Sequence, residues 1–323
     1  PEAAAYATNL YAANTLFSMK LSDRAGESAY TEALKDTARN AHGVWIRTEG
    51  GHTRHEMTDS QTTTRGDWGL VQVGGDIASW PASGAHRYHV GLMAGYAHET
   101  SKTGSSAVNY KAKGKVNGYS VGLYGTWMNS DPTGAGPYVD TWLSYQRFKN
   151  TVESSDMEVE ESYHTKGFTA SLEAGYTFAL KDWKGSNGTE NAARLRFETQ
   201  VIRMGVRGGD HLESTRTLVQ GTGAGNVRTR VGVTAYHLFS NSAKGSALKP
   251  YLSLNWFHDT KSFGSVMDGV TDKITGSRNF GEVKLGLEGK LTKNVNLWGA
   301  AGYQMGSHGL RNAEALLGLK YLF

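Results

Sequence analysis

Apolar and polar residues alternate with a period of two through most of the chain, from about Val44 to Phe323. This period is typical of β-strands with one buried face, because successive side chains of a strand point to opposite faces. Twelve segments carry the alternation, so the sequence predicts an all-β fold of twelve antiparallel strands. Their approximate ranges are 43–52, 66–77, 86–98, 116–128, 137–149, 166–179, 193–205, 227–239, 249–260, 280–291, 295–305 and 311–323.

The connections between the predicted strands alternate between long and short. Long polar connections lie near 53–65, 99–115, 150–165, 206–226 and 261–279, and shorter ones near 78–85, 129–136, 240–248 and 292–294. The stretch 180–192 breaks the pattern because it is longer than the other short connections. Long loops at one end, short turns at the other and an even strand number are typical of transmembrane barrels of the bacterial outer membrane. A soluble two-sheet sandwich is the alternative, but no apolar face is deep enough for its core.

One face of each predicted strand is apolar or aromatic, and the other combines glycines with charges of both signs. In the segment 166–179, for example, Phe168 and Leu172 alternate with Ser171 and Glu173. An Arg or Lys against lipid costs about 2–4 kcal/mol at the middle of a membrane, so we expect the charged face to line the lumen. The candidate lumen residues are Arg47, Glu49, Asp140, Glu173, Glu198, Gln200, Arg230, Asn255 and Glu288. They either pair with one another and with water, or some of them hydrogen-bond the helix predicted for the start of the chain.

The first 21 residues differ from the rest, because they are rich in Ala and contain no Gly (PEAAAYATNLYAANTLFSMKL). They predict a helix over about 3–21. Leu10, Asn14 and Phe17 recur at steps of three and four residues, but several polar residues dilute this apolar face. Such a helix suits a wet, narrow channel, and we expect it to plug the lumen.

The polar residues 22–42 are expected to add a helical turn or two before the first strand. The chain therefore divides into a linker, 1–42, and a barrel, 43–323. No secretory signal precedes the predicted helix, which indicates a mature protein or an excised piece of one.

The composition agrees with a membrane barrel. The mean hydropathy of −0.47 and the absence of an apolar run of 18 residues exclude a transmembrane helix, but barrel strands need only about 9–11 alternating residues. The 41 Gly fit a curved sheet, the 16 Tyr and 8 Trp fit interfacial girdles, and there are only 5 Pro to interrupt strands. The chain has no Cys, and its net charge of +4 includes no clustered basic face of the kind that binds nucleic acid.

The last six residues, GLKYLF, place Leu319, Tyr321 and Phe323 on one face of the final strand. This arrangement matches the C-terminal signal by which the outer-membrane assembly machinery recognises its clients.

Several motifs resemble the translocator domain, or β-domain, of monomeric type Va autotransporters, over essentially the whole chain. They are Tyr11-Ala12-Ala13-Asn14-Thr15-Leu16-Phe17, Asp23-Arg24, Val44-Trp45-Ile46-Arg47, Tyr138-Val139-Asp140, Ser171-Leu172-Glu173-Ala174-Gly175-Tyr176 and Tyr321-Leu322-Phe323. Within this family the chain most resembles the translocators of AIDA-type adhesins.

The resemblance implies an integral barrel of the bacterial outer membrane that exports the passenger domain preceding it to the cell surface. The implied partners are that passenger, the assembly machinery with periplasmic chaperones, and the lipid bilayer; the barrel would act as a monomer, without cofactor, metal or catalytic residue. In the serine-protease branch of the family, the passenger is cut between two adjacent Asn residues of the helix. Asn9 and Asn14 are not adjacent, so we expect any cleavage to lie upstream of Pro1.

Two other functions remain as alternatives. In the first, the chain is a general porin or ligand-binding barrel, and residues 1–42 form a periplasmic appendage. In the second, it is an outer-membrane protease of the omptin type, with His52, His55 and Asp59 of the first long loop near the active site. Omptin-like barrels have ten strands, which disfavours the protease.

Overall fold

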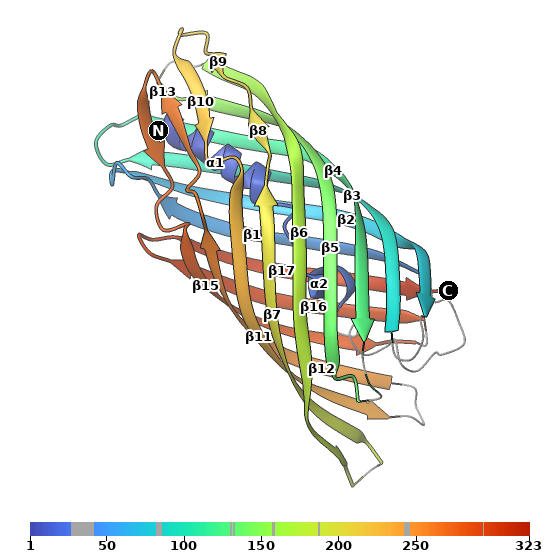
Figure 1. The fold of residues 1–323 in the computed structure, drawn as a ribbon. Coiled ribbons are helices and arrows are strands. Elements are labelled where there is room, and N and C mark those ends of the chain that lie inside the picture. The colour runs from blue at the N-terminus through green and yellow to red at the C-terminus, as the bar shows by residue number, and fades with distance from the viewer. Residues whose placement is uncertain are drawn as a thin grey trace.

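The computed structural model describes residues 1–26, 42–81, 86–129, 131, 133–156, 159–186, 188–241, 246–292 and 294–323. Its main body is a closed antiparallel barrel of twelve long strands (Figure 1). The strands are β1 (Gly43–Glu56), β2 (Thr62–Pro81), β3 (His86–Ser105), β4 (Lys111–Asn129), β5 (Gly136–Ser154), β6 (Val159–Lys184), β7 (Glu190–Met204), β11 (Asn226–Asn241), β12 (Ser246–Asp259), β15 (Asn279–Lys290), β16 (Val295–Gly306) and β17 (Arg311–Leu322). The predicted twelve-stranded barrel is therefore confirmed.

Each long strand pairs with the long strands before and after it in the chain, and the first pairs with the last. The closing pair runs from Gly43 opposite Leu322 to Arg54 opposite Arg311. Closure leaves no free strand edge, so the backbone N–H and C=O groups of the wall are satisfied without water, as lipid requires.

Burial alternates along the strands and separates an apolar outer face from a polar inner face. In β6, Phe168 and Leu172 are each 57% exposed, whereas Thr169 and Glu173 between and beside them are buried. The same parity leaves an aliphatic and aromatic band on the outside of every long strand. Inside, large aromatic side chains lie flat over glycines of the neighbouring strand, as Trp298 lies over Gly318. A side chain at Gly318 would meet the indole ring at 2.1 Å, which explains part of the high glycine content.

The strands at the long-loop end extend further than the sequence pattern predicts. The predicted loop at 99–115 narrows to residues 106–110, since β3 runs to Ser105 and β4 begins at Lys111. These extensions carry polar residues on both faces, so the alternation that marks a strand disappears there. At the other end, β6 runs to Lys184 across a β-bulge at Ala179/Lys181, and most of the longish connection 180–192 is strand. The turns that include residues 82–85, 130, 132, 187, 242–245 and 293 lie partly outside the described residues.

Two predicted loops contain short strands instead of irregular chain. The loop at 206–226 contains β8 (Arg207–Gly208), β9 (His211–Leu212) and β10 (Leu218–Thr222), and the loop at 261–279 contains β13 (Gly264–Met267) and β14 (Val270–Lys273). β8 adds to β6, and the other four form a small sheet in the order β14-β13-β10-β9. This sheet lies at the mouth of the barrel beside the N-terminus (Figure 1).

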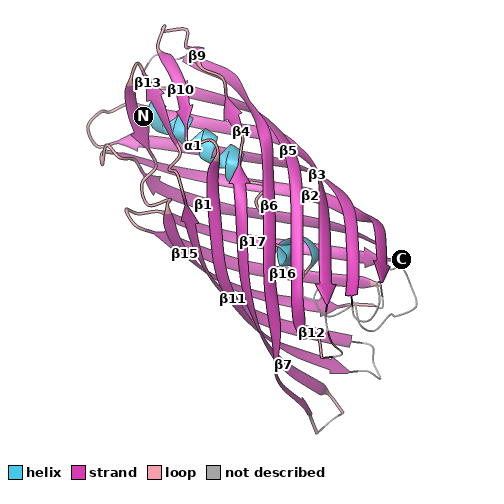
Figure 2. Cartoon of the chain, viewed as in Figure 1, coloured by secondary structure: helices cyan, strands magenta, loops and turns pink. Residues whose placement is uncertain are grey.

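The N-terminal segment contains two helices inside the barrel, α1 (Glu2–Thr15) and the short α2 (Leu21–Ala25) (Figure 2). The prediction of one helix to residue 21 was wrong. The side chains of Thr15 and Ser18 hydrogen-bond the carbonyls of Tyr11 and Asn14, and Lys20 is extended, with its N–H donated to Asp23 Oδ2 at 3.0 Å. Such local bonds compete with the helical pattern.

α2 lies at the start of the stretch that we expected to add a helical turn. The remainder of that prediction, residues 27–41, lies outside the described residues. No helix in the described ranges is both long and apolar enough to cross a membrane.

The two ends of the chain lie at opposite ends of the barrel (Figure 1). Glu2 contacts Ser154, at the long-loop end of β5, whereas the Phe323 N–H donates to the carbonyl of His42 at the short-turn end. Residues 1–26 of the linker therefore lie in the lumen, with Glu2 toward the mouth, and residue 42 lies at the short-turn end. In outer-membrane barrels the long loops face the outside of the cell.

Candidate functional site in the barrel lumen

α1 lies between one part of the barrel wall and the mouth sheet. It contacts β2 to β6 of the wall and β10, β13 and β14 of the mouth sheet. Its alanines at positions 4, 5, 7, 12 and 13 are completely or almost completely buried, as are the polar Thr8, Asn9 and Asn14. Small residues let the helix backbone lie close to the wall, and burial on all sides explains why the sequence shows no single apolar face.

Polar side chains fix the position of α1 along the lumen. Asn14 Nδ2 donates to the Val206 carbonyl at 2.9 Å, and the Val206 N–H donates back to Asn14 Oδ1 at 3.0 Å. Asn9 Nδ2 donates to the Thr151 carbonyl at 3.0 Å, and Thr8 Oγ1 and His55 Nε2 hydrogen-bond at 2.9 Å. Each bond pairs a helix residue with one particular place on the wall, so the helix has a defined height.

The other two predicted plug residues, Leu10 and Phe17, make apolar contacts. Leu10 is buried among Met204, Phe263 and their neighbours. Phe17 lies just beyond α1, in the break between the helices, with its ring 5.9 Å from that of Phe148.

α2 is held on one side by a buried ion pair with β5. Arg24 reaches Asp140 through two contacts, NH2 to Oδ1 at 2.6 Å and NH1 to Oδ2 at 3.2 Å, and it also donates to Thr126 Oγ1 at 3.1 Å. The guanidinium lies 4.0 Å from the centre of the Tyr124 ring. Both charged side chains are at most 2% exposed, and a buried charge is tolerated in a protein only with such pairing.

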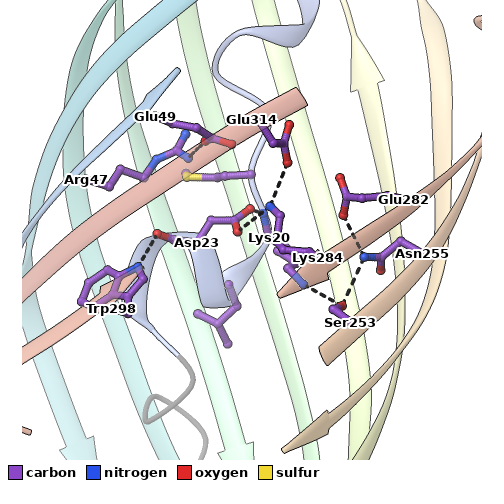
Figure 3. Close-up of polar contacts among 12 residues, drawn as sticks. Lys20, Asp23, Arg47, Glu49, Ser253, Asn255, Glu282, Lys284, Trp298 and Glu314 are labelled. Carbon is purple, nitrogen blue, oxygen red and sulfur yellow. Dashed lines mark hydrogen bonds and ion pairs between the residues drawn. The ribbon is translucent and has the colours of Figure 1, made fainter. Parts of the chain in front are cut away.

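On its other side, α2 contacts β1 and β15 to β17, and Lys20 just before it contacts β12 (Figure 3). Asp23 lies 3.5 Å from Lys284 Nζ, which also pairs with Glu314 at 3.1 Å. The Trp298 indole N–H donates to the Asp23 carbonyl at 3.2 Å, and Lys20 Nζ donates to Ser253 at 3.3 Å. We refer to residues Lys20–Ala25 and these wall partners, together with Asp140, as the α2 clamp.

Among the candidate lumen residues, Asp140, Glu173 and Gln200 form hydrogen bonds or ion pairs with residues 19–24 of the linker. Asp140 pairs with Arg24, Glu173 Oε2 accepts the Leu21 N–H at 2.9 Å, and Gln200 Nε2 donates to the Met19 carbonyl at 2.8 Å. All three contacts involve residues 19–24 and none involves α1. Met19 and Leu21 lie within the range predicted as helix, but all three partners come after the end of α1 at Thr15.

The other candidates lie inside the barrel and bond mainly to one another. Arg230 connects four of the nine candidates, because it reaches Glu198 at 2.6 Å, Gln200 and Asn255 at 2.9 Å and Glu173 at 3.3 Å. Arg47 pairs with its neighbour Glu49 at 2.7 Å. Glu288 is buried on β15, beside the backbone of Gly26.

Several lumen residues were not among the candidates. Lys20, Asp23 and Arg24 belong to the linker, where no periodicity marks them. Lys284 and Glu314 do alternate with apolar residues on their strands, so strand parity alone was enough to place them in the lumen.

A cavity of about 110 Å³ lies beside the break between the two helices. Its lining mixes polar residues such as Lys20, Glu49 and Lys284 with apolar ones such as Met19 and Ile202, and it is large enough for several water molecules. The linker is thus packed tightly along α1 and more loosely at the break.

The residues suggested for an omptin-type site do not come together. His52 is exposed and lies 2.8 Å from Asp67, whereas His55 is buried against α1. Partial burial works to raise the pKa of Asp59, but hydrogen bonds from Thr62 and from the backbone N–H of Gln61 outweigh it and lower the pKa below its usual range. Asp59 therefore caps the β1–β2 turn. Within the described part of the chain, no group of three or more His, Asp or Glu side chains could hold a metal ion.

Known proteins similar to this chain share both its sequence and its architecture. The family described as autotransporter beta-domain matches residues 44–302. YdeU of Escherichia coli K12 is 41% identical over 324 residues, which are 99% of this chain and 69% of YdeU. The autotransporter adhesin AIDA-I of Escherichia coli is 35% identical over 326 residues, all of this chain but 25% of AIDA-I. The chain thus spans about a quarter of that adhesin.

The solved structures agree with this relationship. The crystal structure of the transport unit of AIDA-I superimposes with a TM-score of 0.88 at 34% identity, covering 100% of this chain and 99% of that one. The barrel is an integral protein of the bacterial outer membrane, as its closed form and apolar outer face require. From the match over most of its length and the shared fold, we conclude that the chain belongs to the autotransporter β-domain family.

Proposed function

We propose that this chain is the translocator unit that exports a passenger segment, attached ahead of Pro1, across the outer membrane. The observation that carries the proposal is the course of the linker, which passes through the lumen and leads to the mouth of the barrel. A passenger that continued from α1 would therefore emerge at the long-loop end. In this proposal residues 1–42 are the linker, residues 43–323 are the barrel, and one chain acts as a monomer.

The lumen residues then have a holding role. We propose that Asp140, Glu173 and Gln200 hold the linker at the α2 clamp, and that Arg47, Glu49, Glu198, Arg230, Asn255 and Glu288 keep the wall polar and internally paired. Leu10, Asn14 and Phe17 would close the upper lumen. We assign no catalytic step to any of them.

A reporter fusion tests the export proposal directly. A small reporter domain that folds readily would be fused ahead of Pro1, behind a secretion signal, and expressed in a Gram-negative host. Added protease should then remove the reporter from intact cells while the barrel stays intact. A folded barrel with a reporter that is degraded only after the outer membrane is opened would contradict export.

Conductance separates the translocator from a general porin. The full chain should conduct poorly in planar bilayers, because α1 and α2 occupy the lumen, and a variant lacking residues 1–26 should conduct strongly. Equal conductance of the two forms would instead favour the porin, with the linker outside the lumen.

We also propose that Leu319, Tyr321 and Phe323 form the signal read by the assembly machinery, with periplasmic chaperones delivering the unfolded chain. All three side chains lie on the outer face of the C-terminal end, 36–65% exposed, where another protein can reach them before insertion. Phe323→Ala should slow barrel insertion in cells, and Leu291→Ala, an equally exposed apolar residue in a turn, should not. If both variants inserted at the same rate, the proposal that these residues form the signal would be wrong.

A further inference from the structure

The outer face of the barrel carries two rows of basic side chains near the mouth. The first row consists of Arg65 on β2, Lys102 on β3 and Lys113 on β4. Lys102 is directly opposite both of the others in the strand register, so the three point to the same side of the sheet. All three side chains are exposed.

The second row repeats this arrangement on the adjacent strands. Arg147 on β5 is opposite Lys166 on β6, which in turn is opposite Arg207 on β8. These side chains are exposed as well. Side chains directly opposite one another have Cβ atoms only about 4.5–5.5 Å apart, and like charges in such pairs destabilise a sheet.

Few acidic residues offset these charges. Glu153 pairs with Lys115 and lies 3.7 Å from Lys113, and Asp67 pairs with His52. Among the described residues, no acidic side chain forms an ion pair with the remaining five basic residues of the two rows. Two rows of opposed like charges therefore stand outside the barrel with little internal compensation.

The position of the rows indicates what lies against them. On β5 and β6, Arg147 and Lys166 are each two residues from an aromatic ring on the same face, Tyr145 and Phe168, whose centres are 5.2 Å apart. Below these rings the outer face becomes aliphatic, as at Leu172. Aromatic girdles mark the boundary between hydrocarbon and headgroups, so the second row lies at headgroup level. The first row lies six residues beyond the outward Tyr96 and Tyr119 on β3 and β4, further toward the mouth.

We propose that these two rows bind the phosphate groups of glycolipid headgroups in the outer leaflet of the membrane. The rows lie at the end of the barrel that faces the outside, because Ser154 at the same end of β5 contacts Glu2 near the mouth. Phosphate supplies the negative charge that the sheet lacks, and the guanidinium groups of the Arg residues suit its oxygens through paired N–H donors. Bound lipid would convert a repulsive arrangement into an attractive one. This inference concerns the outer surface and does not depend on export.

Native mass spectrometry of the full chain, with defined lipid added to detergent micelles, tests the proposal. The probes are diphosphorylated lipid A, the same lipid with both phosphates removed, and phosphatidylglycerol. We expect the unmodified chain to retain diphosphorylated lipid A at least about tenfold better than the other two, because each basic group near an anionic headgroup contributes measurably.

Charge removal tests the assignment to the two rows. The variants Arg65→Gln/Lys102→Gln/Lys113→Gln and Arg147→Gln/Lys166→Gln/Arg207→Gln should each weaken retention of diphosphorylated lipid A about tenfold or more. The matched control, Arg216→Gln/Lys261→Gln/Lys273→Gln, removes three exposed basic residues from the same end of the barrel but outside the rows, and should bind as the unmodified chain does.

Heat-modifiable gel mobility shows that each variant is folded before binding is compared. Two results would overturn the proposal. In the first, the unmodified chain retains dephosphorylated lipid A or phosphatidylglycerol as well as it retains diphosphorylated lipid A. This comparison needs no variant. The other is a loss in the control variant as large as that in the row variants.

Discussion

Replacing Arg24 with Ala should release α2 from the wall and open the lumen. The substitution removes a guanidinium that reaches Asp140 at 2.6 and 3.2 Å, donates to Thr126 and lies over the Tyr124 ring. It leaves the Asp140 carboxylate in place, 1% exposed and without its counter-charge. The clamped state therefore holds an uncompensated buried charge, which water could solvate once α2 moves away.

The size of the increase in opening follows from the free energy of keeping the unpaired Asp140 carboxylate buried. Removing one partner of a buried ion pair costs about 3–5 kcal/mol, most of it from the charge left behind. Since about 1.4 kcal/mol corresponds to a tenfold change in an equilibrium constant, the ratio of released to clamped linker should rise roughly a hundredfold to several thousandfold. The cavity beside the break between the helices already gives water a place close to the clamp.

Single-channel recording in planar bilayers measures that ratio as the fraction of time spent in the open state. Arg24→Ala should open far more often than the unmodified chain, whereas Arg311→Ala, which removes an exposed arginine from β17, should not. The double variant Arg24→Ala/Asp140→Ala should open less often than Arg24→Ala, because it leaves no buried carboxylate without a counter-charge. Open times equal to those of the unmodified chain, or a double variant that opens more than the single one, would refute the reasoning.

Two further substitutions test other contacts of the linker. Asn14→Ala leaves the buried N–H and C=O of Val206 without partners, at about 1–3 kcal/mol, and should speed amide exchange of α1 in hydrogen-exchange mass spectrometry; unchanged exchange would contradict a fixing role. Gly318→Ala puts a methyl group 2.1 Å from the Trp298 ring, so it should displace the indole from its bond to the linker and raise channel opening. Gly289→Ala, whose methyl group would meet nothing nearer than 3.9 Å, is the control, and equal behaviour of the two would count against the clamp.

The strands were predictable where the membrane imposes a pattern and not elsewhere. Between lipid and lumen, one face must be apolar and the other tolerates charge, and all twelve segments followed from that contrast. Beyond the membrane both faces meet water, so the ends of β3 and β4 at the mouth carry no alternation and were assigned to a loop. The short strands of the mouth sheet were missed for the same reason.

The sequence predicted which face of each strand lines the lumen, but not which lumen residues contact one another. Strand parity placed Glu173 and Arg230 inside the barrel, but their contact joins β6 to β11 across β7 and depends on register. The Arg24–Asp140 pair joins residues 116 positions apart and depends on how far the linker reaches into the lumen. After the break at Thr15, the Met19 carbonyl and the Leu21 N–H bond to side chains of the wall, contacts that a helical propensity summed over the segment does not include.

The polar character of the lumen has a consequence for export. An apolar wall would hold any apolar segment that entered it, so a passing chain would be retained wherever it matched. Buried polar pairs act differently, because a wall carboxylate such as Asp140 is favourable to bury only when a particular cation lies against it. A passing segment without such a cation leaves the carboxylate exposed to water, so no ion pair stabilises that segment in the lumen. Under the proposed function, the α2 clamp therefore selects the one segment that carries Lys20, Asp23 and Arg24 at the right spacing, and lets the preceding chain pass.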